Sequence, residues 1–315
     1  MFKGVNELVH DSNSIYVVAH ENPDGDAIGS SFATYLGLKQ IGKDVKVIMK
    51  KCSDSFKFLP HIEDAIQSVE KDEYDLLICV DSSDKTRLDI SEEDFNKAKK
   101  ILMLDHHKKV NPYGDINCID ETLPAAAEII YNFLKEINVE ITKDIATYIY
   151  TGIMTDTGSF NYSSTKASTL RIAADLVDIG IDFSDICKRL NDTIKEAKLK
   201  LISKSINNME VYFDGKLRYT YIDYDTILSL GIDDEDAEGM TNYLRMVEGT
   251  QVAVYVRGRS DGTSKVSMRS SGEVDVSKIA IAFGGGGHER AAGYTIKGDI
   301  NKAKSELIEM IEGMV

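Results

Sequence analysis

Short apolar runs alternate with helical patterns through the first half of the chain, and most of these runs end in histidine or aspartate. The runs read SIYVVAH, VKVIMK, YDLLICVD and KKILMLDHH. Such alternation predicts a parallel sheet covered by helices. Ligands of such sheets bind beyond the carboxyl ends of the strands, where His20, Asp81 and residues 105–107 fall. The sequence therefore predicts an α/β domain with its site at that edge.

The pattern changes after Pro124, where helical segments continue to about Met209 and are followed by strands, a glycine run and a closing helix. A length of 315 residues gives room for about two domains at roughly 150 residues each. We expect an N-terminal α/β domain at 1–186, with a parallel sheet and helices on both faces. A helical linker at 187–210 and a smaller α+β domain at 211–315 should follow.

The segment VVAHENPDGDAIGS brings three candidate metal ligands within seven residues: His20, Asp24 and Asp26. One interpretation is structural, because aspartates at such positions commonly cap a helix and a histidine can simply end a strand. The other is a divalent-cation site, since Gly25 lets the backbone turn tightly enough to aim both carboxylates. The combination on one turn favours the metal site.

Two further strand ends carry ligand-type residues. Asp81 can supply a carboxylate that bridges two metals about 3.5 to 4 Å apart, a spacing that suits phosphoester hydrolysis. In the triplet Asp105, His106 and His107, one histidine should face the metal and the other the substrate, with Asp105 orienting a ligating imidazole. Asp156, in TGIMTDTGSF, is either a ligand or a helix cap.

These motifs resemble those of the DHH phosphoesterases, which are named for the triplet seen here at 105–107, and the resemblance spans essentially the whole chain. It implies a site for two divalent ions, usually manganese. One ion would be held by His20, Asp24 and Asp81, and the other by Asp26, Asp81, His106 and Asp156. The resemblance also implies that Asp81 and Asp105 belong to the catalytic residues, and that His107 contacts the substrate phosphate or donates a proton.

The C-terminal segment GGGGHERAAG resembles the GGGH motif of the first type of DHH-associated domain. A glycine run can present backbone N–H groups to an anion, and His288 and Arg269 can add charged donors. A plain glycine turn between a strand and a helix is the alternative. The expected substrate contacts are Gly285, Gly286, Gly287, His288, Arg269 and Arg257, within a stretch 257–290 that holds six basic and four acidic residues.

Charge and apolar content limit the partners. The net charge of −15 argues against tight binding to a long nucleic acid such as duplex DNA, so a phosphate-bearing partner should be short. No stretch approaches the roughly 18 apolar residues of a membrane span, and the N-terminus has no signal-peptide core. The four cysteines are widely spaced. We expect a cytoplasmic protein without a membrane partner, and related enzymes suggest a homodimer.

Within the family, the two-domain form resembles the bifunctional enzymes that hydrolyse short oligoribonucleotides to mononucleotides and 3′-phosphoadenosine 5′-phosphate (pAp) to AMP. It equally resembles standalone phosphodiesterases of cyclic-di-AMP and pApA, which share the same motifs. A third possibility is a sensor that binds such a nucleotide without hydrolysing it, and the presence of every metal ligand of the family pattern speaks against it. The sequence predicts a short-RNA or adenine-nucleotide substrate.

Overall fold

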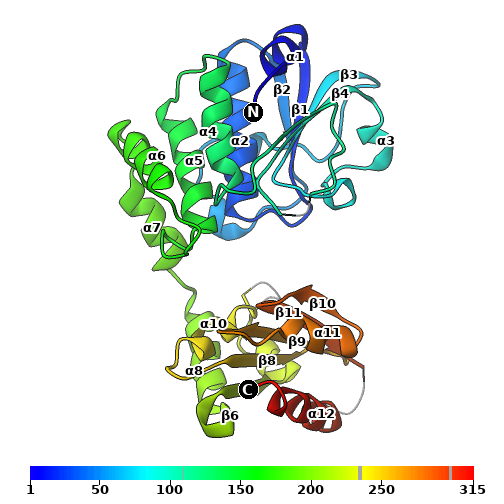
Figure 1. The fold of residues 1–315 in the computed structure, drawn as a ribbon, viewed down its shortest axis with the longest axis vertical. Coiled ribbons are helices and arrows are strands. Elements are labelled where there is room, and N and C mark those ends of the chain that lie inside the picture. Colours follow the sequence, from blue (N-terminus) through cyan, green and yellow to red (C-terminus); the bar gives the residue numbers. More distant parts are fainter. Residues whose placement is uncertain (109, 233–235, 298–299) are drawn as a thin grey trace. The chain divides into compact units, whose positions relative to one another are not determined.

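The computed structural model describes residues 1–108, 110–232, 236–297 and 300–315, and it divides into two compact units (Figure 1). The first unit is Met1–Thr193 and the second is Ile194–Val315. Helix α7 (Phe183–Asn191) lies in the first unit and helix α8 (Glu196–Asn207) in the second. The division therefore falls inside the segment 187–210 that the sequence assigns to a linker.

The first unit is built on a five-stranded parallel sheet with the strand order β2-β1-β3-β4-β5. Its strands are β1 (Ser14–Val18), β2 (Asp44–Ile48), β3 (Tyr74–Val80), β4 (Ala98–Asp105) and β5 (Ile116–Ile119). Nearly every residue of β1 and β3 is buried, as expected for strands covered on both faces. The α/β fold class predicted from the sequence is confirmed.

The two faces of this sheet are covered differently. Ile15 and Val17 of β1 belong to the larger core, which includes residues of α2, α4 and α5, and these helices run alongside one another in Figure 1. Tyr16 and Val18 point to the other face, where α3 and loop residues such as Val69 and Leu88 provide the cover. The helices of this unit are α1 (Val5–Asp11), α2 (Gly25–Gln40), α3 (Glu92–Phe95), α4 (Ala126–Glu136), α5 (Lys143–Asp156), α6 (Ala167–Asp178) and α7. The 3-10 turns are η1 (Asp54–Phe56), η2 (Ile62–Asp64) and η3 (Lys85–Arg87).

Glycines allow α2 and α5 to pack unusually closely. A Cβ atom at Gly29 would lie 2.5 Å from the carbonyl oxygen of Tyr148, and one at Gly152 would lie 2.8 Å from Asp26 Oδ1. Both distances are far below the ordinary contact distance between non-bonded atoms. The close approach brings the first turn of α2, which carries Asp26, against the last turns of α5, which ends at Asp156.

The second unit contains a six-stranded mixed sheet with the order β10-β11-β9-β8-β7-β6, in which β7 and β8 are parallel and the other pairs antiparallel. Its strands are β6 (Glu210–Tyr212), β7 (Leu217–Ile222), β8 (Val252–Gly258), β9 (Ser264–Ser270), β10 (Gly286–His288) and β11 (Ala291–Ile296). Its helices are α8, α9 (Tyr224–Ser229), α10 (Met240–Arg245), α11 (Val276–Ala282) and α12 (Ile300–Glu312), with a 3-10 turn, η4 (Phe213–Gly215). One face packs on α11 and α12, and the other on α8, α9 and α10.

Among the described residues, no helix combines the length and the apolar character that crossing a membrane requires.

Candidate metal centre

The predicted metal ligands converge at the carboxyl edge of the first unit's sheet. His20 follows β1 and is buried. Asp24 is the N-cap of α2, and its Oδ1 accepts the backbone N–H groups of Asp26 and Ala27, each at 3.1 Å. The helix-cap interpretation of Asp24 is therefore correct in itself. It does not compete with the metal interpretation, because Asp24 also lies in a group with His20 and Asp81.

Asp26 is held by the N-terminus of α4. Its Oδ2 accepts the backbone N–H of Ala126 at 2.6 Å, and its Oδ1 accepts that of Ala127 at 2.9 Å. Backbone N–H groups at a helix N-terminus favour negative charge, so this contact supports an ionised carboxylate in a buried position. These amides cannot be recognised from the sequence, because nearly every residue type supplies a backbone N–H. Pro124 just before the helix is the available signal.

Asp81 lies at the centre of the site, directly after β3, and is almost fully buried. Its Oδ2 is 3.8 Å from His20 Nε2, while its Oδ1 is 3.4 Å from His106 Nε2. Oδ1 is buried and accepts no hydrogen bond within the described structure. Burial works to raise the pKa of Asp81, but its interaction with His106 lowers it below the ordinary value. Each oxygen thus faces a different histidine.

His106 directs one ring nitrogen into the carboxylates. Its Nδ1–H donates to the carbonyl oxygen of Leu123 at 3.2 Å, since a carbonyl can only accept. Nε2 lies 3.7 Å from Asp26 Oδ2 and 3.4 Å from Asp156 Oδ2. A backbone hydrogen bond to the remote nitrogen is the usual way in which a ligating imidazole is oriented.

Asp105 orients His107 rather than His106. Its Oδ1 accepts the His107 Nδ1–H at 2.7 Å and the backbone N–H of His106 at 2.8 Å. The two histidines, which are expected to contact different partners, differ in exposure. The His107 side chain is 37% exposed and the His106 side chain is 13% exposed. Their rings nevertheless lie side by side, with centroids 4.8 Å apart, because both residues follow the end of β4 and strand alternation no longer applies.

The carboxylates of the site raise one another's pKa values. Burial raises the pKa of Asp26 well above its ordinary value, and the charges of Asp81 and Asp156 raise it further. Burial, with repulsion from Asp81 and Asp24, raises the pKa of Asp156 to about 6. Burial opposes the charged form of His106, but the surrounding carboxylates raise its pKa to about 10. All three shifts show that the carboxylates repel one another and favour a positive charge at this position.

A divalent cation fits this environment. Three groups of ligand atoms each lie within 4.8 Å of one another: His20/Asp24/Asp81, Asp26/His106/Asp156 and Asp81/His106/His107. The first two correspond to the two ligand sets implied by the resemblance, apart from the second position of Asp81. Carboxylate oxygens and imidazole nitrogens are the donors that Mn²⁺ and similar ions accept. The unpartnered, buried Asp81 Oδ1 is the specific atom that a cation would satisfy.

In the second unit, Arg269 and His288 lie on one cross-strand row. His288 of β10 pairs with Ala291 of β11, which in turn pairs with Arg269 of β9. Two strand spacings of about 4.8 Å separate them, and the small Ala291 lies between. Residues in register point to the same face, so the structure brings these two predicted substrate contacts together.

The glycine run is partly a helix stop and partly an edge strand. The N–H groups of Gly284 and Gly285 donate to carbonyl oxygens of α11, so they are not available to an anion. Gly286 and Gly287 belong to β10, which lies at the edge of the sheet, so only one side of the strand is paired. Of the three glycines predicted to contact the substrate, Gly285 therefore cannot offer its N–H to an anion.

Arg257 lies apart from this pair. It pairs with Lys265 at the other end of β8 and β9, is buried, and contacts Glu238 Oε1 through Nη2 at 3.2 Å. The neighbouring Lys265 contacts the same carboxylate. The structure does not bring Arg257 together with Arg269 and His288.

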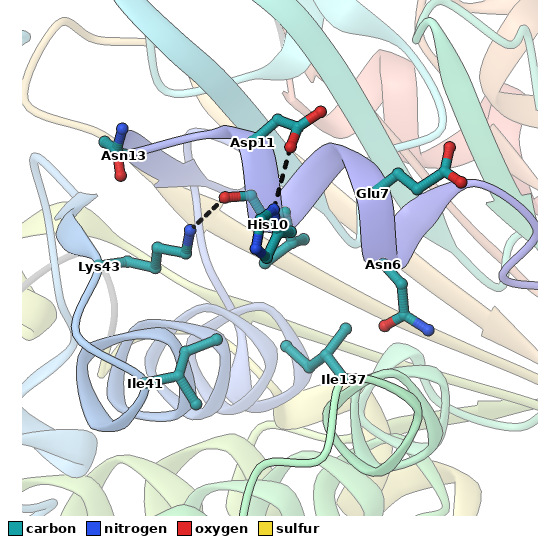
Figure 2. A pocket seen from close by; sticks show the side chains of 9 residues that line it. Asn6, Glu7, His10, Asp11, Asn13, Ile41, Lys43 and Ile137 are labelled. Atoms are coloured by element: carbon teal, nitrogen blue, oxygen red, sulfur yellow. Dashed lines mark hydrogen bonds and ion pairs between the residues drawn. The ribbon is translucent and has the colours of Figure 1, made fainter.

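A surface pocket of about 970 Å³ lies beside α1, lined by residues that include Asn6, His10, Lys43 and Ile137 (Figure 2). Its lining contains none of the predicted ligands. Its interactions are His10 with Asp11 and the Lys43 ammonium with the His10 carbonyl, both at the surface. The His10 and Asp11 side chains are 87% and 80% exposed, and none of the candidate metal-ligand groups found among the described residues includes them, so the carboxyl edge is the candidate site.

The fold and the cluster define a phosphoesterase with an α/β unit followed by a mixed-sheet unit. Residues 14–153 match the DHH family N-terminal domain, and residues 214–314 match the DHHA1 domain. The chain belongs to the DHH family and carries the family's DHHA1 domain.

Similar proteins share this organisation over nearly their whole length. The bifunctional oligoribonuclease and PAP phosphatase NrnA of Thermus thermophilus is 33% identical over 94% of this chain and 89% of that protein. The NrnA of Bacillus subtilis is 27% identical over 90% of each. The structure of an exopolyphosphatase-related protein from Bacteroides fragilis superimposes with a TM-score of 0.90 at 26% identity, covering 98% of this chain and 94% of that one.

Two more distant proteins are also similar to this chain. The cyclic-di-AMP phosphodiesterase PdeA of Listeria monocytogenes is 25% identical over 98% of this chain, but only 49% of that protein is covered. The structure of RecJ from Thermus thermophilus in complex with Mn²⁺ has a TM-score of 0.56 at 14% identity, over 99% of this chain and 55% of that one. At that identity the likeness concerns the fold alone.

Proposed function

We propose that this protein hydrolyses short oligoribonucleotides to mononucleotides and pAp to AMP. The observation that carries the proposal is the position of Asp81, whose two carboxylate oxygens face His20 and His106 respectively. A carboxylate that faces two ligand groups can bridge two cations, the arrangement used for phosphoester hydrolysis. The NrnA relatives, whose names state these two activities, support the choice of substrate.

The proposed cofactor is a pair of divalent ions, with manganese as the first candidate. His20, Asp24 and Asp81 would hold one ion, and Asp26, Asp81, His106 and Asp156 the other. Such ions supply Lewis-acid stabilisation of phosphoryl oxygens and acidify water at neutral pH. Manganese is named first because the resemblance to the DHH phosphoesterases implies it, and a donor set of carboxylate oxygens and imidazole nitrogens is compatible with it.

His107 is the proposed proton donor to the leaving oxygen. Asp105 accepts the His107 Nδ1–H, which leaves Nε2 as the ring nitrogen that a substrate can contact. The hydrogen bond to Asp105 raises the pKa of His107, and burial only partly opposes it. A protonated imidazole with a fixed orientation is suited to general-acid catalysis. Asp105 acts through His107 and is a positioning residue in this proposal.

Arg269 and His288 are the proposed contacts of the second unit with a nucleotide phosphate or base. Arginine presents a planar fork of donors to phosphate oxygens, and a histidine two positions across the sheet can add another donor. Gly286 and Gly287, at the sheet edge, are proposed to allow close approach of the ligand. Arg257, which contacts Glu238, is not part of these contacts.

Cleavage of cyclic-di-AMP or pApA is the second candidate, and the similarity to PdeA favours it. The deciding experiment compares turnover with Mn²⁺ on pAp, pApA, a five-nucleotide RNA and cyclic-di-AMP. Phosphate release from pAp together with mononucleotides from the RNA would support the main proposal. Cleavage confined to cyclic-di-AMP or pApA would support the second candidate. Tight nucleotide binding without turnover of any substrate would contradict both and indicate a sensor.

A further inference from the structure

The segment that follows Asp81 returns to the sheet and pairs with the end of β1, where His20 lies. Leu88 forms an antiparallel bridge with His20. On either side of this bridge, the N–H of Glu21 donates to the carbonyl of Arg87 at 2.8 Å, and the N–H of Asp89 donates to the carbonyl of Ala19 at 2.9 Å. The backbone of His20 is therefore fixed by a strand-like contact outside the parallel sheet.

Asp89 fastens this segment to the neighbouring strand. Its side chain is only 7% exposed, its Oδ2 accepts the backbone N–H of Lys50 at 2.6 Å, and its Oδ1 lies 3.1 Å from the Lys50 ammonium. Lys50 follows β2, which pairs with β1. A buried carboxylate remains stable only if its oxygens are satisfied, and here both have a partner on Lys50. The Asp89 side chain thus ties residues 85–89 to the end of β2.

Residues 81–89 connect two metal-ligand positions, Asp81 itself and His20, which pairs with Leu88. The segment begins at Asp81, whose N–H donates to the Leu104 carbonyl, and it ends at Asp89. Leu88, just before Asp89, is buried in the cluster that covers the Tyr16 face of the first unit's sheet. A shift of this segment would change the 3.8 Å separation between His20 Nε2 and Asp81 Oδ2, because its two ends hold these two ligands.

We propose that Asp89 is a positioning residue that holds His20 at the correct distance from Asp81 for metal binding. The inference rests on the metal centre of the proposed function but adds a residue that contacts no ligand directly. Outer partners that orient metal ligands typically contribute about 10- to 100-fold to metal affinity. The expected consequence is a loss of affinity rather than a loss of the site.

Asp75 offers a matched control at the opposite edge of the same sheet. Its Oδ2 accepts the backbone N–H groups of Asn13 and Ser14, each at 3.0 Å, and its Oδ1 lies 3.0 Å from the Lys99 ammonium. Like Asp89, it joins backbone amides and a lysine beside β1. Unlike Asp89, it lies at the amino end, away from the ligands.

The experiment measures Mn²⁺ binding to the metal-free full chain by titration calorimetry, with no substrate present. Asp89→Ala should weaken binding about 10-fold or more, and Asp75→Ala should leave it within about 2-fold. Asp89→Asn retains an acceptor for the Lys50 N–H and should recover part of the affinity. Lys50→Met leaves Asp89 Oδ1 without its ammonium partner but keeps the Lys50 N–H, so it should weaken Mn²⁺ binding less than Asp89→Ala does. In turnover assays, added Mn²⁺ should rescue Asp89→Ala.

The outcomes are distinguishable. Unchanged Mn²⁺ affinity in Asp89→Ala and Asp89→Asn would overturn the positioning role alone, as would an equal loss in Asp75→Ala. If Asp89→Ala does not fold, Asp89→Asn is compared with Asp75→Asn: the first should still bind Mn²⁺ more weakly than the second, and equal affinities would overturn the positioning role. Failure of the wild-type chain to bind Mn²⁺ would overturn the proposed metal centre, and this inference with it.

Discussion

At the scale of single residues, Asp81 has both an unusual environment and an unusual backbone conformation. It combines burial, a carboxylate oxygen without a hydrogen bond, and a left-handed backbone with φ of 50°. Such a conformation is uncommon for a residue other than glycine, and it costs about 1 kcal/mol or more. The surrounding strand end imposes it, because the Asp81 N–H is bound to the Leu104 carbonyl. The conformation aims the carboxylate between two histidines.

Asp81→Ala should reduce turnover by at least about 100-fold, because it removes the carboxylate that faces both ligand groups. Steady-state kinetics on pAp with saturating Mn²⁺ would measure the loss. Asp115→Ala is the control, since Asp115 is a carboxylate just before β5 that pairs with Lys100. A rate for Asp81→Ala equal to that of the control would contradict the two-metal arrangement.

Arg269→Ala should mainly raise KM for nucleotide substrates and change kcat little, because the arginine is proposed to bind away from the breaking bond. The comparison is made with pAp and with an RNA dinucleotide. Lys278→Ala serves as the charge control, as this lysine is exposed and pairs only weakly, at 3.7 Å, with Asp275. An unchanged KM for both substrates would show that Arg269 does not bind them.

Asp75 gives a prediction for the dependence of stability on pH. The N–H of Ser14, the Lys99 ammonium and the N–H of Asn13 lower the pKa of Asp75 to about 2. Its pKa in the unfolded chain is about 3.9, so its contribution is complete above that value and is lost as the pH falls toward 2. The unfolding free energy of the wild type should therefore exceed that of Asp75→Asn at pH 6. This difference should shrink between pH 4.5 and pH 2.5, as denaturant titrations would show. A constant difference across this range would contradict the lowered pKa.

At the scale of elements, the contact between α2 and α5 determines whether the ligands meet. A Cβ at Gly152 would lie 2.7 Å from the Ala127 Cβ and 2.8 Å from Asp26 Oδ1. Gly152→Ala should therefore destabilise the first unit by about 1–3 kcal/mol, as overpacking does, and should weaken Mn²⁺ binding. Thr147→Ala, on the same helix, is the control. Thermal unfolding and metal titration measure the two effects, and a stable variant with normal binding would contradict this account.

Among the elements that the sequence did not reveal are short strands at sheet edges. These are β5, β6 and β10, of which β10 consists of Gly286, Gly287 and His288. Three or four residues with one paired side carry too little apolar alternation to be recognised. The segment SEEDFNKAKK (91–100) has a polar helical pattern, but only a single turn, α3, forms, because Ala98 already pairs with Tyr74 in the sheet. Strand pairing with a distant segment overrides the local helical pattern there.

At the scale of the whole molecule, the two units have separate cores, and this leads to a prediction about metal and stability. Mn²⁺ should relieve the repulsion among the carboxylates of the first unit and stabilise it by about 2.7 kcal/mol at 100 times its dissociation constant. Calorimetry of the full chain should show that Mn²⁺ raises only one of two unfolding transitions. Chelator should reverse the shift. An equal shift of both transitions, or none, would contradict metal binding confined to the first unit.

The sequence by itself indicated the family, through its motifs, the α/β class, and the candidate metal ligands that the structure brings together. It could do so because strand periodicity is local, and because each motif, such as His20 to Asp26, lies within a few residues of a strand end. Only the tertiary structure decided which partners these residues have. Asp105 holds His107 rather than His106, Asp26 rests on the start of α4, and Asp89 secures His20. The contacts of Asp26 and Asp89 use backbone groups of segments distant in sequence, so no local pattern encodes them. Asp105 and His107 are two residues apart, and there the fold decides only which of the two imidazoles the carboxylate meets.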